Sequence, residues 1–246
     1  MTTPDAHTQR DALGEHPDEP HGGALSQRLN ALRAAVLGAN DGIVSTAGVV
    51  LGVAGATTDK QPVLIAGVAA LVAGAVSMAL GEYVSVSSQR DSERALVEKE
   101  RRELHESPDA ELEELIGLYE KRGLSRSTAT TVAEELTAAD ALRAHLDIEL
   151  GIDPDEFVSP TVAAISSAIS FVIGGLLPVL AVILAPGAWS VQITYVAVLL
   201  ALAVTGALGA RMGGAPAGRA ALRVVVGGAI GLLLTFSVGR LFGAAI

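Results

Sequence analysis

The chain has 246 residues, half of them hydrophobic, with 27 glycines and no cysteine. The lack of cysteine excludes disulfides and thiolate metal sites, so any metal would have carboxylate, imidazole, thioether or water ligands, a set that favours Mn²⁺, Fe²⁺ or Mg²⁺. The formal net charge of −10 arises from residues 87–158, which hold 19 acidic and nine basic residues, and this excess disfavours nucleic acid and anionic lipid as partners and favours cations.

Residues 1–30 predict a disordered N-terminal tail. They are polar, contain several prolines and lack the apolar core of a signal peptide. The tail also contains three histidines, for which a solvated position is a better interpretation than a metal site: His7, His16 and His21.

Residues 31–86 predict two transmembrane helices, the first from Arg33 to Ala56 and the second from Pro62 to about Val86. Each stretch has almost no charge over about 20 residues, which is the length that crosses a bilayer. Glycines recur along both stretches at intervals of four or seven residues, and such stripes allow helices to pack closely. The glycines in these stripes are Gly38, Gly42, Gly48, Gly52, Gly67, Gly74 and Gly81.

Residues 87–158, the acidic domain, predict a helical metal-binding domain between the second and third spans. No proline or glycine occurs from Ser87 to Glu106, so we expect the second transmembrane helix to continue out of the membrane. Serine and proline begin helices and glycine ends them. The two following helices are expected from Pro108, capped by Ser107, to near Gly123 and from Ser125 or Ser127 to near Gly151.

Residues 159–246 predict three more transmembrane helices. The apolar stretches run from Pro160 to Ala185, with Pro178 expected to kink the helix, from about Ser190 to Ala210, and from about Ala220 to Ala244. The predicted fold is therefore all-α: a polytopic membrane protein with five transmembrane helices and a cytoplasmic three-helix domain.

The distribution of basic residues predicts the orientation of the chain. With the N-terminus inside, 15 Lys or Arg residues lie on the inner side and two on the outer side. Because positive charge is retained in the cytoplasm, the N-terminus and the acidic domain of this multi-pass cell-membrane protein are expected to be cytoplasmic.

Three side chains within the first two spans are candidates for an ion path: Asp41, Met78 and Glu82. A carboxylate inside a membrane costs about 2.5–3.5 kcal/mol, so Asp41 is expected to face an ion, a proton path or a charged partner. Met78 and Glu82 lie four residues apart and share a helix face, where the thioether suits iron better than magnesium. The alternatives are a hydrated Asp41 near the membrane surface, a packing role for Met78 and an interfacial Glu82.

The acidic domain contains three pairs of candidate ligands, each spaced three or four residues apart and therefore on one helix face. Three such helices resemble the inward carboxylates of di-metal helical bundles, although a solvated acidic face is the alternative. The pairs are Glu100 and Glu103, Glu111 and Glu114, and His145 and Glu149. Phosphate-binding glycine loops, HExxH and G-x-S-x-G are absent from the sequence, so we expect no enzyme.

Two segments resemble the vacuolar iron transporter family, which includes fungal and plant vacuolar iron and manganese importers and many bacterial relatives. They are Asn40-Asp41-Gly42-Ile43-Val44 in the first span and Ser77-Met78-Ala79-Leu80-Gly81-Glu82-Tyr83 in the second. The five spans and the glutamate-bearing segment between the second and third agree with this resemblance, which covers roughly residues 28–245. The chain is similar to the bacterial-type members.

The resemblance implies a homodimer of five-helix protomers, with the ion path between them along Asp41 and Met78. It implies that the five glutamates of the three pairs gather metal on the cytoplasmic side. His145 lies where plant members carry methionine, which replaces one ligand by a harder, pH-sensitive one. Ala70 lies where the plant transporters carry a glutamate, whose role Glu82 would partly take over.

Together these observations predict a divalent metal transporter that exports Fe²⁺ or Mn²⁺ from the cytoplasm in exchange for protons, for metal homeostasis and detoxification. The metal is the transported ion, and no permanently bound cofactor is expected. The expected partners are divalent metal ions, protons, the lipid bilayer and a second copy of the chain, with no nucleic acid. The alternatives are a membrane-anchored metal sensor or buffer, and a ferroxidase, which would need Glu-x-x-His pairs that the sequence lacks.

Overall fold

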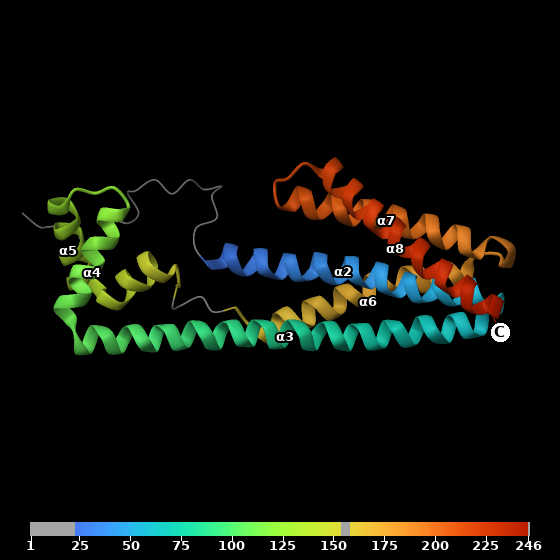
Figure 1. The fold of residues 1–246 in the computed structure, drawn as a ribbon, viewed down its shortest axis with the longest axis horizontal. Coiled ribbons are helices and arrows are strands. Elements are labelled where there is room, and N and C mark those ends of the chain that lie inside the picture. The colour runs from blue at the N-terminus through green and yellow to red at the C-terminus, as the bar shows by residue number, and fades with distance from the viewer. Residues whose placement is uncertain (1–22, 154–157, 246) are drawn as a thin grey trace, which may run out of the picture.

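The computed structural model describes residues 23–153 and 158–245, and every regular element in these ranges is a helix (Figure 1). Five of the helices are long and apolar enough to cross a membrane. They are α2 (Gly23–Ala56), α3 (Lys60–Glu106), α6 (Pro160–Leu184), α7 (Ser190–Met212) and α8 (Ala217–Ala245), with a short 3₁₀ turn, η2 (Gly187–Trp189), before α7. The prediction of an all-α, polytopic membrane protein is confirmed.

The first helix begins before the predicted transmembrane span. Its membrane-spanning part, Leu32–Ala56, agrees with the span predicted from Arg33 to Ala56, but α2 itself begins at Gly23, so residues 23–30 of the predicted tail are helical. Hydropathy marks where a helix becomes apolar, whereas the backbone becomes helical earlier, because the residues from Ala24 to Val36 include no proline or glycine. Residues 1–22, with the three histidines of the predicted tail, lie outside the described ranges.

The helix α3 is continuous over 47 residues and connects the membrane part to the acidic domain. At 1.5 Å per residue it is about 70 Å long, more than twice the thickness of a bilayer core. Asp59 caps its first turn by accepting a hydrogen bond from the Gln61 backbone N–H. It ends at Glu106, as the lack of proline and glycine before that residue predicted.

In the membrane part, α2 is central and contacts α3, α6, α7 and α8. Its glycines permit backbone-to-backbone contact, because a Cβ on Gly42 would collide with the Phe171 carbonyl of α6. Likewise, a Cβ on Gly174 of α6 would meet the Ala39 carbonyl of α2. The predicted close packing therefore holds here, whereas Gly81 of the second stripe faces open space.

The acidic domain combines the end of α3 with α4 (Pro108–Lys121), α5 (Arg126–His145) and a π-helical turn, η1 (Leu146–Leu150). Ser125 caps α5, and Gly123 and Gly151 follow the ends of α4 and η1 with φ of 100° and 62°, a region that favours glycine. Its small apolar core consists of Leu115, Ile116, Ala129, Ala133 and Ile148.

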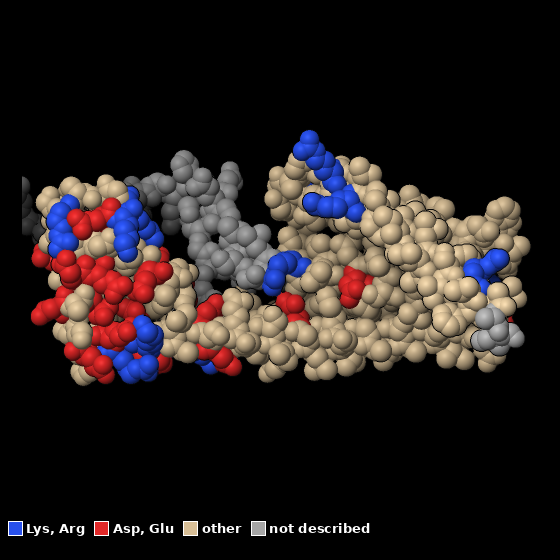
Figure 2. Space-filling model, viewed as in Figure 1, with Lys and Arg blue, Asp and Glu red and all other residues tan. Residues whose placement is uncertain are grey.

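The distribution of charged side chains also separates the acidic domain from the apolar helices. Figure 2 shows acidic side chains gathered over α4, α5 and the end of α3. On the same face, the part formed by α2, α6, α7, α8 and the first half of α3 carries isolated charges. Large apolar side chains are exposed along α3, α6, α7 and α8, as expected of surfaces that contact lipid or another apolar partner.

Candidate functional site

Three predicted ligands converge inside the acidic domain, one from each of its helices. His145 at the end of α5 places Nδ1 3.0 Å from Oε1 of Glu100 on α3 and 3.9 Å from Oε2 of Glu111 on α4. One ligand atom from each of the three residues lies within 4.8 Å of the others. This arrangement can hold a single cation between two carboxylates and an imidazole.

The three side chains are buried but poorly satisfied. His145 is fully buried, and the side chains of Glu100 and Glu111 are only 4% and 11% exposed. Both imidazole nitrogens and Glu100 Oε1 lack a hydrogen-bond partner among the described residues. Buried polar groups without partners are costly, and a cation bound between the three side chains would satisfy these atoms.

The surroundings also change the acidity of the two carboxyls. Burial, reinforced by the nearby negative charges of Glu149, Glu111 and Glu103, raises the pKa of Glu100 to about 7. Burial is also the main cause that raises the pKa of Glu111, and Glu114 adds to it. A dication would compete with the proton that Glu100 partly retains near neutral pH.

The backbone around His145 departs from a regular α-helix. Asp140 has an extended conformation (φ −164°, ψ 95°), and its Oδ1 accepts a hydrogen bond of 3.0 Å from the Arg143 backbone N–H. Asp140 therefore acts as an internal cap that restarts the helix five residues before His145. The π-helical turn η1 follows, and Arg122 donates a hydrogen bond to the Ile148 carbonyl within it.

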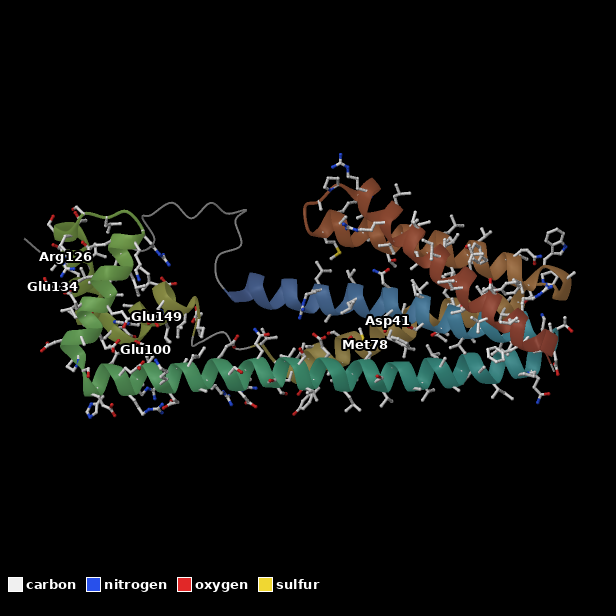
Figure 3. All side chains as sticks on the ribbon, in the orientation of Figure 1. Asp41, Met78, Glu100, Arg126, Glu134 and Glu149 are labelled. Atoms are coloured by element: carbon white, nitrogen blue, oxygen red, sulfur yellow. The ribbon has the colours of Figure 1, made fainter. Side chains whose placement is uncertain are left out.

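The other members of the three pairs lie further out. Glu149 Oε2 is 3.8 Å from His145 Nδ1 and is partly exposed, so it can complete the cluster (Figure 3). Glu103 forms an ion pair of 2.6 Å with Lys99, and Glu114 is exposed. The structure thus brings one residue of each predicted pair into the centre, namely Glu100, Glu111 and His145, with Glu149 beside them.

A second group of predicted residues lines a groove in the membrane part. Asp41 on α2 and Met78 and Glu82 on α3 border a cavity of about 450 Å³ between these helices. Figure 3 shows Asp41 and Met78 on the two facing helices. Ser45, one turn after Asp41, donates a hydrogen bond of 2.6 Å to the Asp41 Oδ1. The groove thus combines two carboxylates and a thioether, and Ala70 also lines it.

Two of these acidic side chains have partners that were not predicted from the sequence. Arg33 Nη2 lies 3.6 Å from Glu82 Oε1, with Glu82 only 13% exposed, and Ser45 is bound to Asp41. Arg33, Asp41 and Ser45 are spaced by multiples of four, a signal for a shared helix face that was available in the sequence.

Comparison with known proteins shows which family this chain belongs to. A model described as the VIT family matches residues 32–240. This chain is a member of the VIT family.

Its VIT-family relatives are similar over most of their length. The "Vacuolar iron transporter" of Acanthamoeba castellanii is 46% identical over 237 residues, which cover 94% of this chain and 87% of the relative. The "Vacuolar iron transporter homolog 1" of Oryza sativa subsp. japonica is 35% identical, with 94% and 82% covered, and the "Vacuolar iron transporter homolog 4" of Arabidopsis thaliana is 36% identical, with 89% and 87% covered. The expected resemblance, and the assignment to a family of transporters rather than enzymes, are confirmed.

Proposed function

We propose that this chain transports Fe²⁺ or Mn²⁺ across a membrane along the groove between α2 and α3. The observation that carries the proposal is the convergence of Asp41, Met78 and Glu82 on one cavity in the membrane part of a VIT-family chain. Intramembrane carboxylates are costly, and a metal path gives them a function that a mere anchor does not need. Oxygen and thioether ligands suit Fe²⁺ and Mn²⁺, and the names of the relatives support iron.

In this proposal the acidic domain collects metal for the groove. Its net negative charge raises the local concentration of cations, and the cluster of Glu100, Glu111 and His145 binds one of them, with Glu149 as a fourth ligand. Glu103 and Glu114 contribute charge near the cluster. The continuous helix α3 then connects the cluster to Glu82 and Met78.

The proposed direction is export from the cytoplasm. The excess of basic residues on the side of the acidic domain supports a cytoplasmic N-terminus and a cytoplasmic acidic domain. Metal would pass Glu82 and Met78, then Asp41, and leave at the other face, while protons titrate the carboxylates and move the opposite way. In a cell this activity would lower cytoplasmic iron or manganese.

A second copy of the chain is proposed to cover the groove. Leu37 and Ser45 line it and are exposed in the single chain, so Asp41 would lie close to lipid without a partner. A two-fold symmetric dimer along α2 and α3 would remove the carboxylate from lipid and place the ion path between the protomers.

Flux measurements in proteoliposomes test the function. We expect uptake of Mn²⁺ and anaerobic Fe²⁺ that depends on the protein and increases when the vesicle interior is made acidic. Protein-dependent flux without an effect of the pH gradient would contradict proton coupling alone. No flux of either ion would contradict transport.

The second candidate function is a membrane-anchored metal sensor or buffer, and the buried cluster in the acidic domain favours it. Mn²⁺ binding that requires Glu100 and His145, in a protein without measurable flux, is the result that this function predicts.

A further inference from the structure

The pair of Arg33 and Glu82 lies at one end of the groove. On α2, Arg33 precedes Leu37, Asp41 and Ser45 by steps of four residues, so it extends the row of side chains that line the groove. Its guanidinium lies 3.6 Å from Glu82, the last acidic lining residue on α3 toward the acidic domain. α2 runs away from the acidic domain and α3 runs toward it (Figure 1), so Arg33, before Asp41, and Glu82, after Met78, lie at the end of the groove nearer to the acidic domain.

The two partners differ in exposure. The Glu82 side chain is 13% exposed, whereas that of Arg33 is 64% exposed. In the single chain, Glu82 is therefore enclosed by the helices around it, while Arg33 reaches it from the surface along a long side chain. The distance of 3.6 Å is long for an ion pair, and the exposed arginine can return to water, so a dication can displace it.

We propose that the Arg33 guanidinium pairs with the Glu82 carboxylate until a metal ion displaces it. Replacement of the guanidinium by the metal ion at Glu82 then admits metal to the groove. The arginine keeps the carboxylate neutralised inside the membrane and excludes weakly bound monovalent cations. A dication with two positive charges competes better for Glu82 than a monovalent ion does. Arg33 is thus a specificity-determining residue at the groove entrance, an inference that rests on the proposed transport.

Accessibility of a single cysteine tests this without measuring flux. Because the chain has no cysteine, Ser77→Cys places one thiol in the groove. Its rate of modification is measured with a trimethylammonium-ethyl methanethiosulfonate, which is cationic, and with methyl methanethiosulfonate, which is neutral. The comparison uses purified full-length protein with Arg33, Arg33→Gln, Arg33→Lys or Arg219→Gln, the last being an exposed arginine outside the groove lining.

We expect Arg33→Gln to raise the rate with the cationic reagent by about three- to tenfold, because one positive charge near the groove is lost. The rate with the neutral reagent should stay unchanged. Arg33→Lys and Arg219→Gln should resemble the parent. Glu82→Gln should lower the cationic rate, and the double variant Arg33→Gln, Glu82→Gln should return close to the parent.

Mn²⁺ protection provides the second measurement on the same proteins. Arg33→Gln should protect Ser77→Cys at several-fold lower Mn²⁺ than the parent, since no arginine has to be displaced. An equal rise with both reagents would show that Arg33 acts only through packing and would overturn the inference, as would unchanged rates or unchanged protection. If the parent shows no metal flux while the modification rates and Mn²⁺ protection change as expected, the proposed transport is contradicted but the exchange at Glu82 is supported.

Discussion

At the scale of single residues, Glu100 combines a buried position with three acidic neighbours. Its pKa is raised to about 7, above the ordinary range of a glutamate, chiefly because burial penalises the charged form. It lies 3.0 Å from an imidazole that is fully buried and has no hydrogen bond of its own among the described residues. A cation would lower the free energy of both groups at once.

This environment predicts that metal binding by the acidic domain depends on pH. Glu100 is protonated below about pH 7 and must lose that proton to bind metal, so affinity falls as the pH decreases. Below pH 7 we expect the Mn²⁺ dissociation constant to rise about tenfold for each pH unit, measured by isothermal titration calorimetry. Glu100→Gln should bind weakly at every pH, whereas Glu98→Gln, an exposed residue on the same helix, should behave as the parent does. A dissociation constant that stays constant between pH 6 and 8 would refute this assignment.

At the scale of elements, the interruption of α5 positions the imidazole. Asp140→Ala removes the hydrogen bond that caps the last part of the helix, which should cost about 1 kcal/mol of stability. Misplacement of His145 should weaken Mn²⁺ binding about tenfold, as for other residues that orient metal ligands. Asp140→Ser can still accept the hydrogen bond and should retain most of the affinity, and Glu135→Ala on the exposed side of α5 serves as the control. Equal affinity in Asp140→Ala and the parent would remove this role.

The packing of α2 against α6 makes a second prediction at this scale. Gly174→Ala forces a Cβ against the Ala39 carbonyl, so we expect a loss of about 1–3 kcal/mol, seen as a lower thermal midpoint in detergent. The control is Gly231→Ala in α8, where no atom lies within 4 Å of the added Cβ and alanine favours the helix. If both variants melt alike, backbone contact at Gly174 does not stabilise the helix pair.

The elements also show how far the sequence could predict this structure. The length of α3 follows from a run without proline or glycine. The start of α5 follows from Ser125, and the ends of α4 and η1 follow from Gly123 and Gly151. The convergence of the ligands does not, because spacing defines a helix face but not its rotation toward neighbouring helices. Glu103 shares a face with Glu100 yet pairs with Lys99 instead. The contact between Arg33 and Glu82 likewise requires the packing of α2 on α3.

At the scale of the whole molecule, the distribution of basic residues predicts which side each turn faces. Single cysteines at Thr58, in the turn between α2 and α3, and at Ser127, in the acidic domain, can be labelled in intact cells because the chain has no other cysteine. We expect a membrane-impermeant maleimide to label Thr58→Cys in intact cells and Ser127→Cys only after permeabilisation. The reverse pattern would place the acidic domain outside and contradict export from the cytoplasm.

The central claim is that the groove between α2 and α3 is the metal path, and Asp41 is its most direct test. Asp41→Asn keeps the shape of the side chain and an oxygen that can accept the Ser45 hydrogen bond, but removes the negative charge from the groove. The measurement is Mn²⁺ flux into proteoliposomes that contain equal amounts of inserted parent, Asp41→Asn or Asp91→Asn, the last an exposed acidic residue on α3 outside the groove lining. We predict that Asp41→Asn lowers Mn²⁺ flux at least about tenfold, because it removes the carboxylate that would replace water ligands of the ion. Asp91→Asn should keep the flux of the parent. If Asp41→Asn transports Mn²⁺ as fast as the parent does, metal does not pass through this groove.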